Sequence, residues 1–187
     1  MSRDRAWALA KSQTRYNLTT YRKLQARDFG SVATIVTTDF EALYAYEHGD
    51  YQRCLQLSTQ NARTLLNARR MPDVLTIMMF VPLFDDEIVS LIALTLIVDR
   101  ECRAVSVDDV RISQLTLSLY LVAKCQLVLR HSVMSMITTF DCIEIARRRL
   151  PADRCLDHLT LKMTKRNIMN WAHRFICISL VVRIGLA

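Results

Sequence analysis

Hydrophobic residues recur at helical spacing along much of the chain, and the pattern is clearest over residues 51–66. One face of this segment carries Tyr51, Cys54, Leu55, Ser58, Ala62, Leu65 and Leu66. The opposite side carries the polar residues Arg53, Gln56, Gln60 and Arg63. Because residues three and four apart share one side of a helix, this spacing predicts an amphipathic helix with one buried and one solvated side.

Turn residues separate this helix from an earlier one, predicted over residues 31–48. Gly49 suits the left-handed conformation that ends a helix, because glycine has no Cβ to clash there. Asp50 is a good N-cap for the next helix, and Pro72 disfavours helical angles at the residue before it. The sequence therefore predicts a helical hairpin that turns at Gly49, with a positive φ at that residue.

The first hundred residues contain three further segments with weaker patterns. A helix is predicted over residues 2–24, with Gly30 as a C-terminal cap. The apolar runs at residues 74–83 and 87–98 have no decisive period, and their Ile, Val and Thr content is compatible with strands. We favour helices for both runs because the neighbouring segments are helical, with Asp85 or Asp86 capping the second.

Three helices are predicted over about the last eighty residues. Residues 112–129 are apolar nearly all round, which is typical of the central helix of a bundle and predicts burial of Leu119, Val122 and Leu129. A turn at His131 and Ser132 precedes a helix that ends near Leu150. Its apolar stripe comprises Val133, Met136, Ile137, Phe140, Ile143 and Ala146. Pro151 is predicted in the first turn of the final helical region.

These elements predict an all-α fold in one domain over residues 1–187. It would consist of antiparallel helical hairpins, arranged either as repeats or as an irregular bundle. Residues 1–28 form a basic N-terminal helix in this prediction, and residues 167–187 an apolar C-terminal segment that packs less well. The low content of glycine and proline, 3 of each, leaves few tight turns for an all-β fold.

The stretch "ALYAYEHGDYQRC" resembles a tetratricopeptide repeat at residues 42–54. Ala42, Gly49 and Tyr51 match the small residue, the turn glycine and the turn tyrosine of that family, and Cys54 stands where alanine is usual. A second resemblance covers residues 143–153, where Ala146 and Pro151 match the late alanine and closing proline. The resemblance implies a helical-repeat scaffold that binds a protein or peptide partner.

The net charge and the arrangement of the cysteines limit the partners and the cellular compartment that we expect for this chain. The formal net charge is +7, with basic residues concentrated before residue 28 and at Arg147, Arg148 and Arg149. An alternative function is therefore a basic helical protein that binds nucleic acid or an acidic membrane surface through these two clusters. The cysteines form no CxxC pair, and the N-terminus lacks an apolar leader, so we expect a cytoplasmic or nuclear protein.

The apolar runs do not predict a transmembrane span. Each is shorter than the ~18 residues that a span needs. Acidic residues follow the first run, and Arg183 interrupts the C-terminal one. The C-terminal segment could alternatively act as a surface anchor.

Residues with catalytic or ligand chemistry are few. Cys155 and His158 could begin a zinc site, but a structural site takes four ligands and no second pair has matching spacing. Asp85, Asp86 and Glu87 are better explained as helix N-terminal residues than as a cation site. No nucleotide-binding or hydrolase motif occurs. We therefore predict no enzyme activity, catalytic residue, metal or cofactor, and the pattern disfavours a small-molecule ligand.

The predicted function is that of a non-enzymatic scaffold that binds a protein or peptide at the hairpin. Aromatic contacts would come from Tyr44, Tyr46 and Tyr51 near the turn. Ion pairs with acidic side chains would come from Arg53 and Arg63, with Arg69 and Arg70 beyond them.

Overall fold

The computed structural model describes residues 30–68, 75–76, 112–151 and 154–184. The described part is an all-α fold that consists of helices α2, α3, α6, α7 and α8, together with one pair of two-residue strands. The predicted helices at residues 2–24 and 87–98 lie outside the described residues. Asp85, Asp86, Arg69 and Arg70 also lie outside them.

Helices α2, Gly30–Glu47, and α3, Tyr51–Asn67, form the predicted hairpin. Gly49 has a φ of 76°, which confirms the left-handed turn. The Asp50 side chain caps α3 by accepting a hydrogen bond of 3.1 Å from the backbone N–H of Arg53. The prediction for Gly30 is wrong, because this residue begins α2 instead of capping an earlier helix.

A pair of two-residue strands joins two segments that lie far apart in the sequence. Strand β1, Leu75–Thr76, pairs antiparallel with β2, Ile112–Ser113. The helix predicted over residues 74–83 is therefore wrong at Leu75 and Thr76, where the backbone finds its hydrogen-bond partners on another segment. The next helix also begins two residues later than predicted, because Ser113 ends β2 and caps that helix through the N–H of Thr116.

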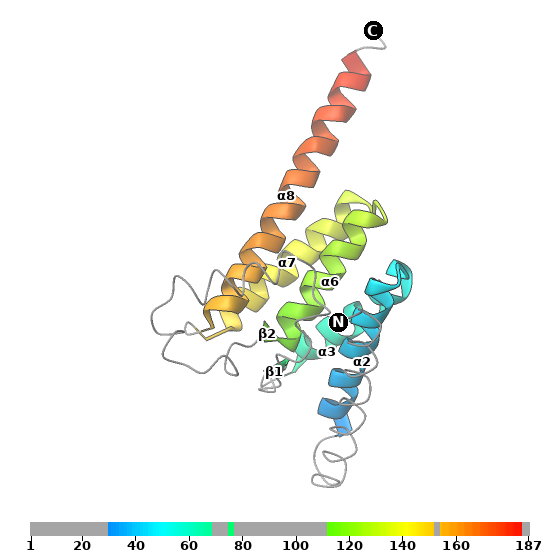
Figure 1. Cartoon of the computed structure of the whole chain (residues 1–187). Coiled ribbons are helices and arrows are strands. Elements are labelled where there is room, and N and C mark those ends of the chain that lie inside the picture. The colour runs from blue at the N-terminus through cyan, green and yellow to red at the C-terminus, as the bar shows by residue number, and fades with distance from the viewer. Residues whose placement is uncertain (1–29, 69–74, 77–111, 152–153, 185–187) are drawn as a thin grey trace, which may run out of the picture.

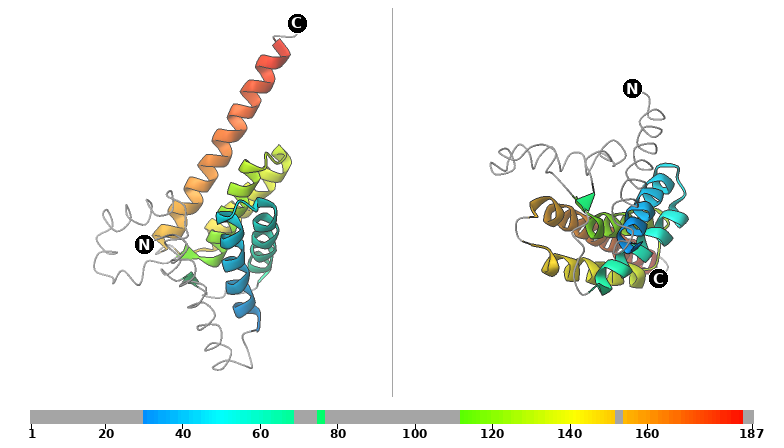
Figure 2. Two further views of the ribbon diagram at one scale, coloured as in Figure 1. Left: turned by 45° about the vertical axis from the view of Figure 1, so that its right-hand side comes forward. Right: turned by 90° about the horizontal axis from the view of Figure 1, so that it is seen from below.

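Helix α6, Gln114–Val128, lies at the centre of the described bundle (Figures 1 and 2). It packs against α2, α3, α7 (Val133–Arg149) and α8 (Cys155–Ile184). Leu119 is 1% exposed and Val122 is 5% exposed, as the apolar pattern predicts. Leu129 is only half-buried, because it follows the last helical residue at the open end of the bundle.

A short turn connects α6 to α7. Arg130 adopts a positive φ of 52° there, and Ser132 caps α7 by accepting a hydrogen bond from the N–H of Ser135. Met136, Ile143 and Ala146 are buried as predicted, whereas Ile137 is exposed on the outer side of α7. The stripe is therefore narrower than the sequence pattern indicates.

Helix α8 is the longest described element, with 30 residues. It begins at Cys155, four positions after Pro151, so the placement of Pro151 in its first turn is wrong. Pro151 instead follows Leu150, the C-cap of α7, and its carbonyl accepts a hydrogen bond from the N–H of Arg154. Asp157 anchors the start of α8 to β2 by accepting a 2.8 Å hydrogen bond from the backbone N–H of Ser113. Among the described residues, none of the helices combines the length and the hydropathy that a membrane span requires.

Candidate interaction surface

Tyr44 lies at the C-terminal end of α2 and is 41% exposed. Its ring stacks on His48 with 4.0 Å between the ring centroids. The Nδ1 atom of His48 lies 2.8 Å from the Tyr44 carbonyl oxygen, which also accepts a hydrogen bond from the backbone N–H of His48. Tyr44 therefore presents an aromatic surface whose position is fixed by the end of the helix.

Tyr46 and Tyr51 lie on either side of the Gly49 turn. Their rings meet edge to face, with 5.6 Å between centroids and an angle of 73° between planes. Both are half-buried and pack against the core cluster that contains Leu43 and Cys54. The structure thus brings these two predicted site residues together, but much of their surface stabilises the hairpin.

Arg53 and Arg63 are both exposed on α3. Arg53 Nη2 lies 3.5 Å from Glu41 Oε2 on α2, and the two side chains are 62% and 49% exposed. An ion pair this exposed is worth little, because water competes for both charges. A partner could therefore replace Glu41 at small cost.

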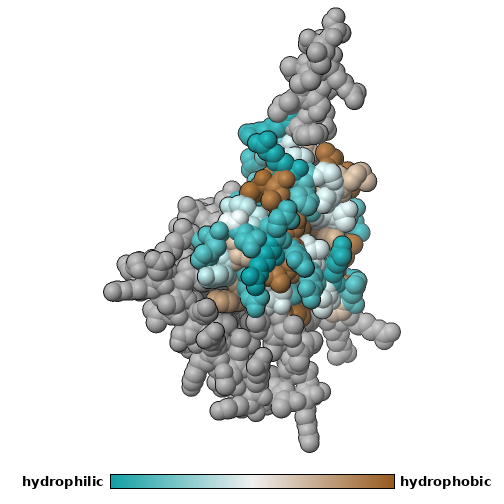
Figure 3. All heavy atoms as spheres, turned by 90° about the vertical axis from the view of Figure 1, so that its right-hand side faces the viewer, coloured by the Kyte–Doolittle hydropathy of each residue, from teal (hydrophilic) through white to brown (hydrophobic). Residues whose placement is uncertain are grey.

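The α3 outer face consists of Gln52, Arg53, Gln56, Gln60 and Arg63, which are all exposed. These residues line a shallow, open depression together with Asp50, Leu55, Thr59 and Thr64. In the described part of the chain, Gln52, Gln56, Gln60 and Arg63 make no side-chain hydrogen bond or ion pair. The face therefore offers a row of unused amide and guanidinium groups along about three helical turns, at 3.6 residues per turn. Figure 3 shows the side of the molecule on which α2 and the turn between α6 and α7 lie. Hydrophilic residues predominate on this side, with apolar residues between them.

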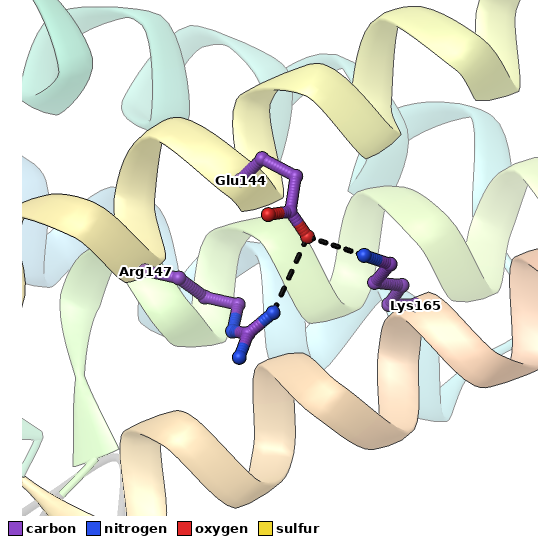
Figure 4. A network of polar contacts seen from close by, with 3 residues as sticks. All are labelled: Glu144, Arg147 and Lys165. Carbon is purple, nitrogen blue, oxygen red and sulfur yellow. Dashed lines mark hydrogen bonds and ion pairs between the residues drawn. The ribbon is translucent and has the colours of Figure 1, made fainter.

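Two of the three arginines in the basic cluster on α7 make contacts within the protein. Arg147 Nη1 lies 3.3 Å from Glu144 Oε1, and Lys165 Nζ on α8 lies 2.6 Å from the same oxygen (Figure 4). The hydrogen bond from Lys165, with the two nearby positive charges, lowers the pKa of Glu144. Arg149 and Arg148 are both exposed. Arg149 Nη1 donates to the Leu66 carbonyl oxygen at the end of α3, whereas Arg148 makes no such contact with a described residue.

The structure reveals a buried polar junction that sequence reasoning missed. Asp39 of α2 accepts hydrogen bonds at Oδ1 from Asn61 Nδ2 of α3, at 2.9 Å, and from Ser118 Oγ of α6, at 3.0 Å. No described residue donates to Asp39 Oδ2. Burial raises the pKa of Asp39 to about 7 despite both hydrogen bonds. The signal available in the sequence was Asn61, which lies beside Ala62 on the mainly apolar side of α3.

Nucleophilic and metal-binding groups do not assemble into a catalytic or metal site among the described residues. Cys54 and Cys125 are buried side by side, and a hydrogen bond from Cys125 lowers the pKa of Cys54 while the same contact raises that of Cys125. His158 Nε2 lies 3.0 Å from the Pro151 carbonyl oxygen. In the part of the chain that the structure describes, no three His, Cys, Asp or Glu side chains converge on a point that a metal ion could occupy.

The chain matches no protein-family model, no curated protein and no solved structure. Its class is therefore defined by its own fold, which is an all-α bundle around α6. The resemblance to tetratricopeptide repeats at residues 42–54 and 143–153 stays a prediction.

Proposed function

We propose that this chain is a non-enzymatic interaction module that docks a protein or peptide on the α3 outer face. The observation that carries the proposal is a row of exposed side chains, Gln52, Gln56, Gln60 and Arg63, that have no hydrogen-bond or ion-pair partner among the residues that the structure describes. Solvated amide and guanidinium groups can form hydrogen bonds with a partner without first breaking contacts within the fold.

The shape of the surface supports a macromolecular partner. Ligand sites for small molecules are concave and bury most of the ligand, whereas this depression is shallow and is lined by one helix. The exposed ring of Tyr44 and the weakly paired Arg53 flank the hairpin turn. Tyrosine and arginine are enriched among residues that contribute most to protein interfaces, and Arg53 and Arg63 favour an acidic partner segment.

The proposal also covers the structural class of the hairpin and the cellular compartment of the protein. The α2–α3 hairpin would act as a tetratricopeptide-like unit, in the cytoplasm or nucleus. Cys54, Cys125 and Cys142 are free thiols, which supports a reducing compartment.

Site-directed photo-cross-linking tests the docking surface. A photoreactive phenylalanine analogue at Gln56 on the α3 outer face should yield a discrete protein adduct in cells. The matched control places the same analogue at Thr138, which is exposed on α7. Arg53→Gln with Arg63→Gln should abolish the Gln56 adduct while leaving the helical content of the protein unchanged.

Two results would contradict the proposal. The first is an equal yield of adducts from Gln56 and Thr138, which would mean that the α3 outer face has no preferred partner. The second is an adduct that disappears on nuclease treatment, which would favour the nucleic-acid alternative.

A further inference from the structure

Two thiols from different helices lie side by side in the core. Cys54 belongs to α3 and Cys125 to α6, and both are part of one cluster of buried side chains that includes Leu43 and Leu117. Each cysteine is free and 0% exposed, and the Cys125 thiol donates a hydrogen bond to the Cys54 sulfur. A disulfide requires two sulfur atoms on neighbouring segments of backbone, and this pair meets that requirement.

The two cysteines lie at opposite kinds of helix end. Cys54 is the fourth residue of α3, whereas Cys125 is the fourth residue from the end of α6. The positive end of the helix dipole stabilises a thiolate near the start of α3, and the negative end destabilises one near the end of α6. The positions of the two cysteines therefore favour ionisation of Cys54.

The hydrogen bonds around the pair act in the same direction. The Cys54 sulfur lies 3.8 Å from the hydroxyl oxygen of Ser58, which is buried beside it. Hydrogen bonds from Cys125 and Ser58 lower the pKa of Cys54, although burial and the charges of Asp39 and Asp50 oppose them. The hydrogen bond to Cys54, together with burial, raises the pKa of Cys125. Cys54 is therefore the nucleophile of the pair, and Cys125 keeps its proton.

We propose that Cys54 and Cys125 are a reversible oxidation site, at which hydrogen peroxide produces a disulfide that ties α3 to α6. The Cys54 thiolate attacks one oxygen of the peroxide, the O–O bond breaks, and Cys54 becomes a sulfenic acid as hydroxide leaves. Cys125 then gives up its proton, and its sulfur displaces the sulfenic hydroxyl group as water. In total, two thiols are oxidised to one disulfide, and one peroxide is reduced to two molecules of water.

Burial selects the oxidant. The half-buried side chains of Tyr46, Tyr51 and Leu55 pack against the cluster that contains the two cysteines. A small movement of these side chains near the Gly49 turn would admit hydrogen peroxide, which is little larger than water. Bulkier thiol reagents require a wider local opening of the hairpin. The pair is therefore suited to a small oxidant.

Cys142 provides a matched comparison. It lies on α7 and packs against a different cluster of buried side chains, which contains Ile143 and Leu161. Cys142 is half-buried, and burial, with the charge of Asp141, raises its pKa. It is therefore more accessible than Cys54 but less readily ionised, and it does not belong to the cluster that contains the pair.

Peptide mapping of the oxidised full chain tests the proposal. Folded protein that has been freed of reductant is treated with hydrogen peroxide, its remaining thiols are alkylated, and it is digested with trypsin without reduction. Cleavage after Arg53 and Lys124 places the two cysteines at the start of the peptides CLQLSTQNAR and CQLVLR. We expect these two peptides to be joined, and dithiothreitol should separate them. The same treatment in urea should instead distribute disulfides among the six cysteines.

Single substitutions separate the roles of the two thiols. Cys125→Ala removes the thiol that resolves the sulfenic acid, so Cys54 should be recovered as a dimedone adduct when the oxidised protein is unfolded in that reagent. Cys54→Ala should leave Cys125 as a free thiol. The control variant Cys142→Ala should give the joined peptides in the same yield as the wild type. Circular dichroism checks that each variant is folded, and the wild-type map needs no variant.

Three results would overturn the proposal. One is the absence of joined peptides from folded wild-type protein. Another is the same mixture of disulfides from folded and urea-unfolded protein, which would mean that the fold does not select this pair. The third is a dimedone adduct on Cys125 in Cys54→Ala as abundant as that on Cys54 in Cys125→Ala, which would contradict the assigned nucleophile. The test is independent of the proposed function, because it measures a bond within the fold and needs no partner.

Discussion

Helices α6 and α3 have similar lengths, 15 and 17 residues, but they occupy opposite kinds of environment. Nearly all of α6 is buried, including polar residues such as Thr116 and Ser118, whereas α3 keeps one side in water. The central helix must satisfy every polar group from within the protein, and the amphipathic helix needs to do so only on its inner side. Position in the bundle therefore decides how much freedom each side chain has to meet a partner.

The two helices also meet at the polar junction. Ser118 of α6 and Asn61 of α3 both donate to the Asp39 carboxylate of α2. On α6, Gln126 forms a second polar link, accepting at Oε1 from Thr139 of α7 and donating from Nε2 to Ser135. Hydrogen bonds of this kind determine which helix faces which neighbour, whereas apolar contacts alone do not specify this arrangement.

The largest expected effect is the loss of stability when a buried side chain of the central helix α6 is shortened. Leu119→Ala leaves a cavity at a side chain that is 1% exposed, and we expect it to lower the free energy of unfolding by ~2–5 kcal/mol. Gln56→Ala on the α3 outer face is the control and should change stability by less than about 0.5 kcal/mol. Urea unfolding followed by circular dichroism measures both. Equal losses would mean that the contrast between the two helices is wrong.

The polar junction should make stability depend on pH. Folded Asp39 keeps its proton up to a pKa of about 7, whereas the unfolded chain releases it near 3.8. Between these values the folded state binds more protons, so stability should fall as pH rises, by at most roughly 1.4 kcal/mol per pH unit. Asp39→Asn retains an oxygen acceptor but does not titrate, so it should flatten this slope.

Asp157 affects how the pH experiment is interpreted. Burial raises its pKa too, so it contributes a slope of the same sign in the wild type and in the variant. The informative quantity is therefore the difference between Asp39→Asn and wild type in unfolding free energy across this pH range. A constant difference would show that Asp39 ionises in the folded protein as it does in the unfolded chain.

A smaller effect is expected at the turn that begins α3. Gly49→Val should destabilise the protein by roughly 1–2 kcal/mol, because a β-branched residue resists a positive φ. Apart from the glycine itself and its two chain neighbours, no described residue has an atom within 4 Å of the Cβ that a side chain would add, so the cost should be conformational. Gly49→Asn separates the two causes: asparagine tolerates this conformation and should cost less than valine in thermal unfolding.

The smallest expected effect concerns the cap of α3. Asp50→Ala removes the acceptor for the Arg53 N–H and should cost about 1 kcal/mol. Asp50→Ser keeps a side-chain oxygen and should restore most of the loss in the same denaturation assay. If the alanine and serine variants were equally unstable, the capping bond would contribute nothing measurable.

Local features of the fold could be predicted because their causes are local. Gly49, Asp50 and the polar side of α3 follow from backbone conformation, capping and helical period over a few residues. The strand pair could not be predicted, since Thr76 meets Ile112 only through a contact between distant segments. Likewise, Leu129 looked like core by its apolar character, but it lies one residue past the end of a helix.

The candidate site was predictable in part for the same reason. Arg53 and Arg63 are exposed as their helical positions indicate. Tyr46 and Tyr51 were expected to face a partner, yet their rings lie largely against the core, because a tyrosine near a turn can fold inward as easily as outward. Whether an aromatic side chain covers its own hairpin depends on the neighbouring helices, which the local sequence does not encode.

The hydrogen bond from Arg149 to Leu66 has a consequence for cooperativity. The last carbonyls of α3 have no partner within their own helix, and one of them is satisfied by a side chain from the end of α7. Fraying of α7 would therefore expose the end of α3 at the same time. The two helix ends should open as one unit in native-state hydrogen exchange, although 83 residues separate the two partners along the chain.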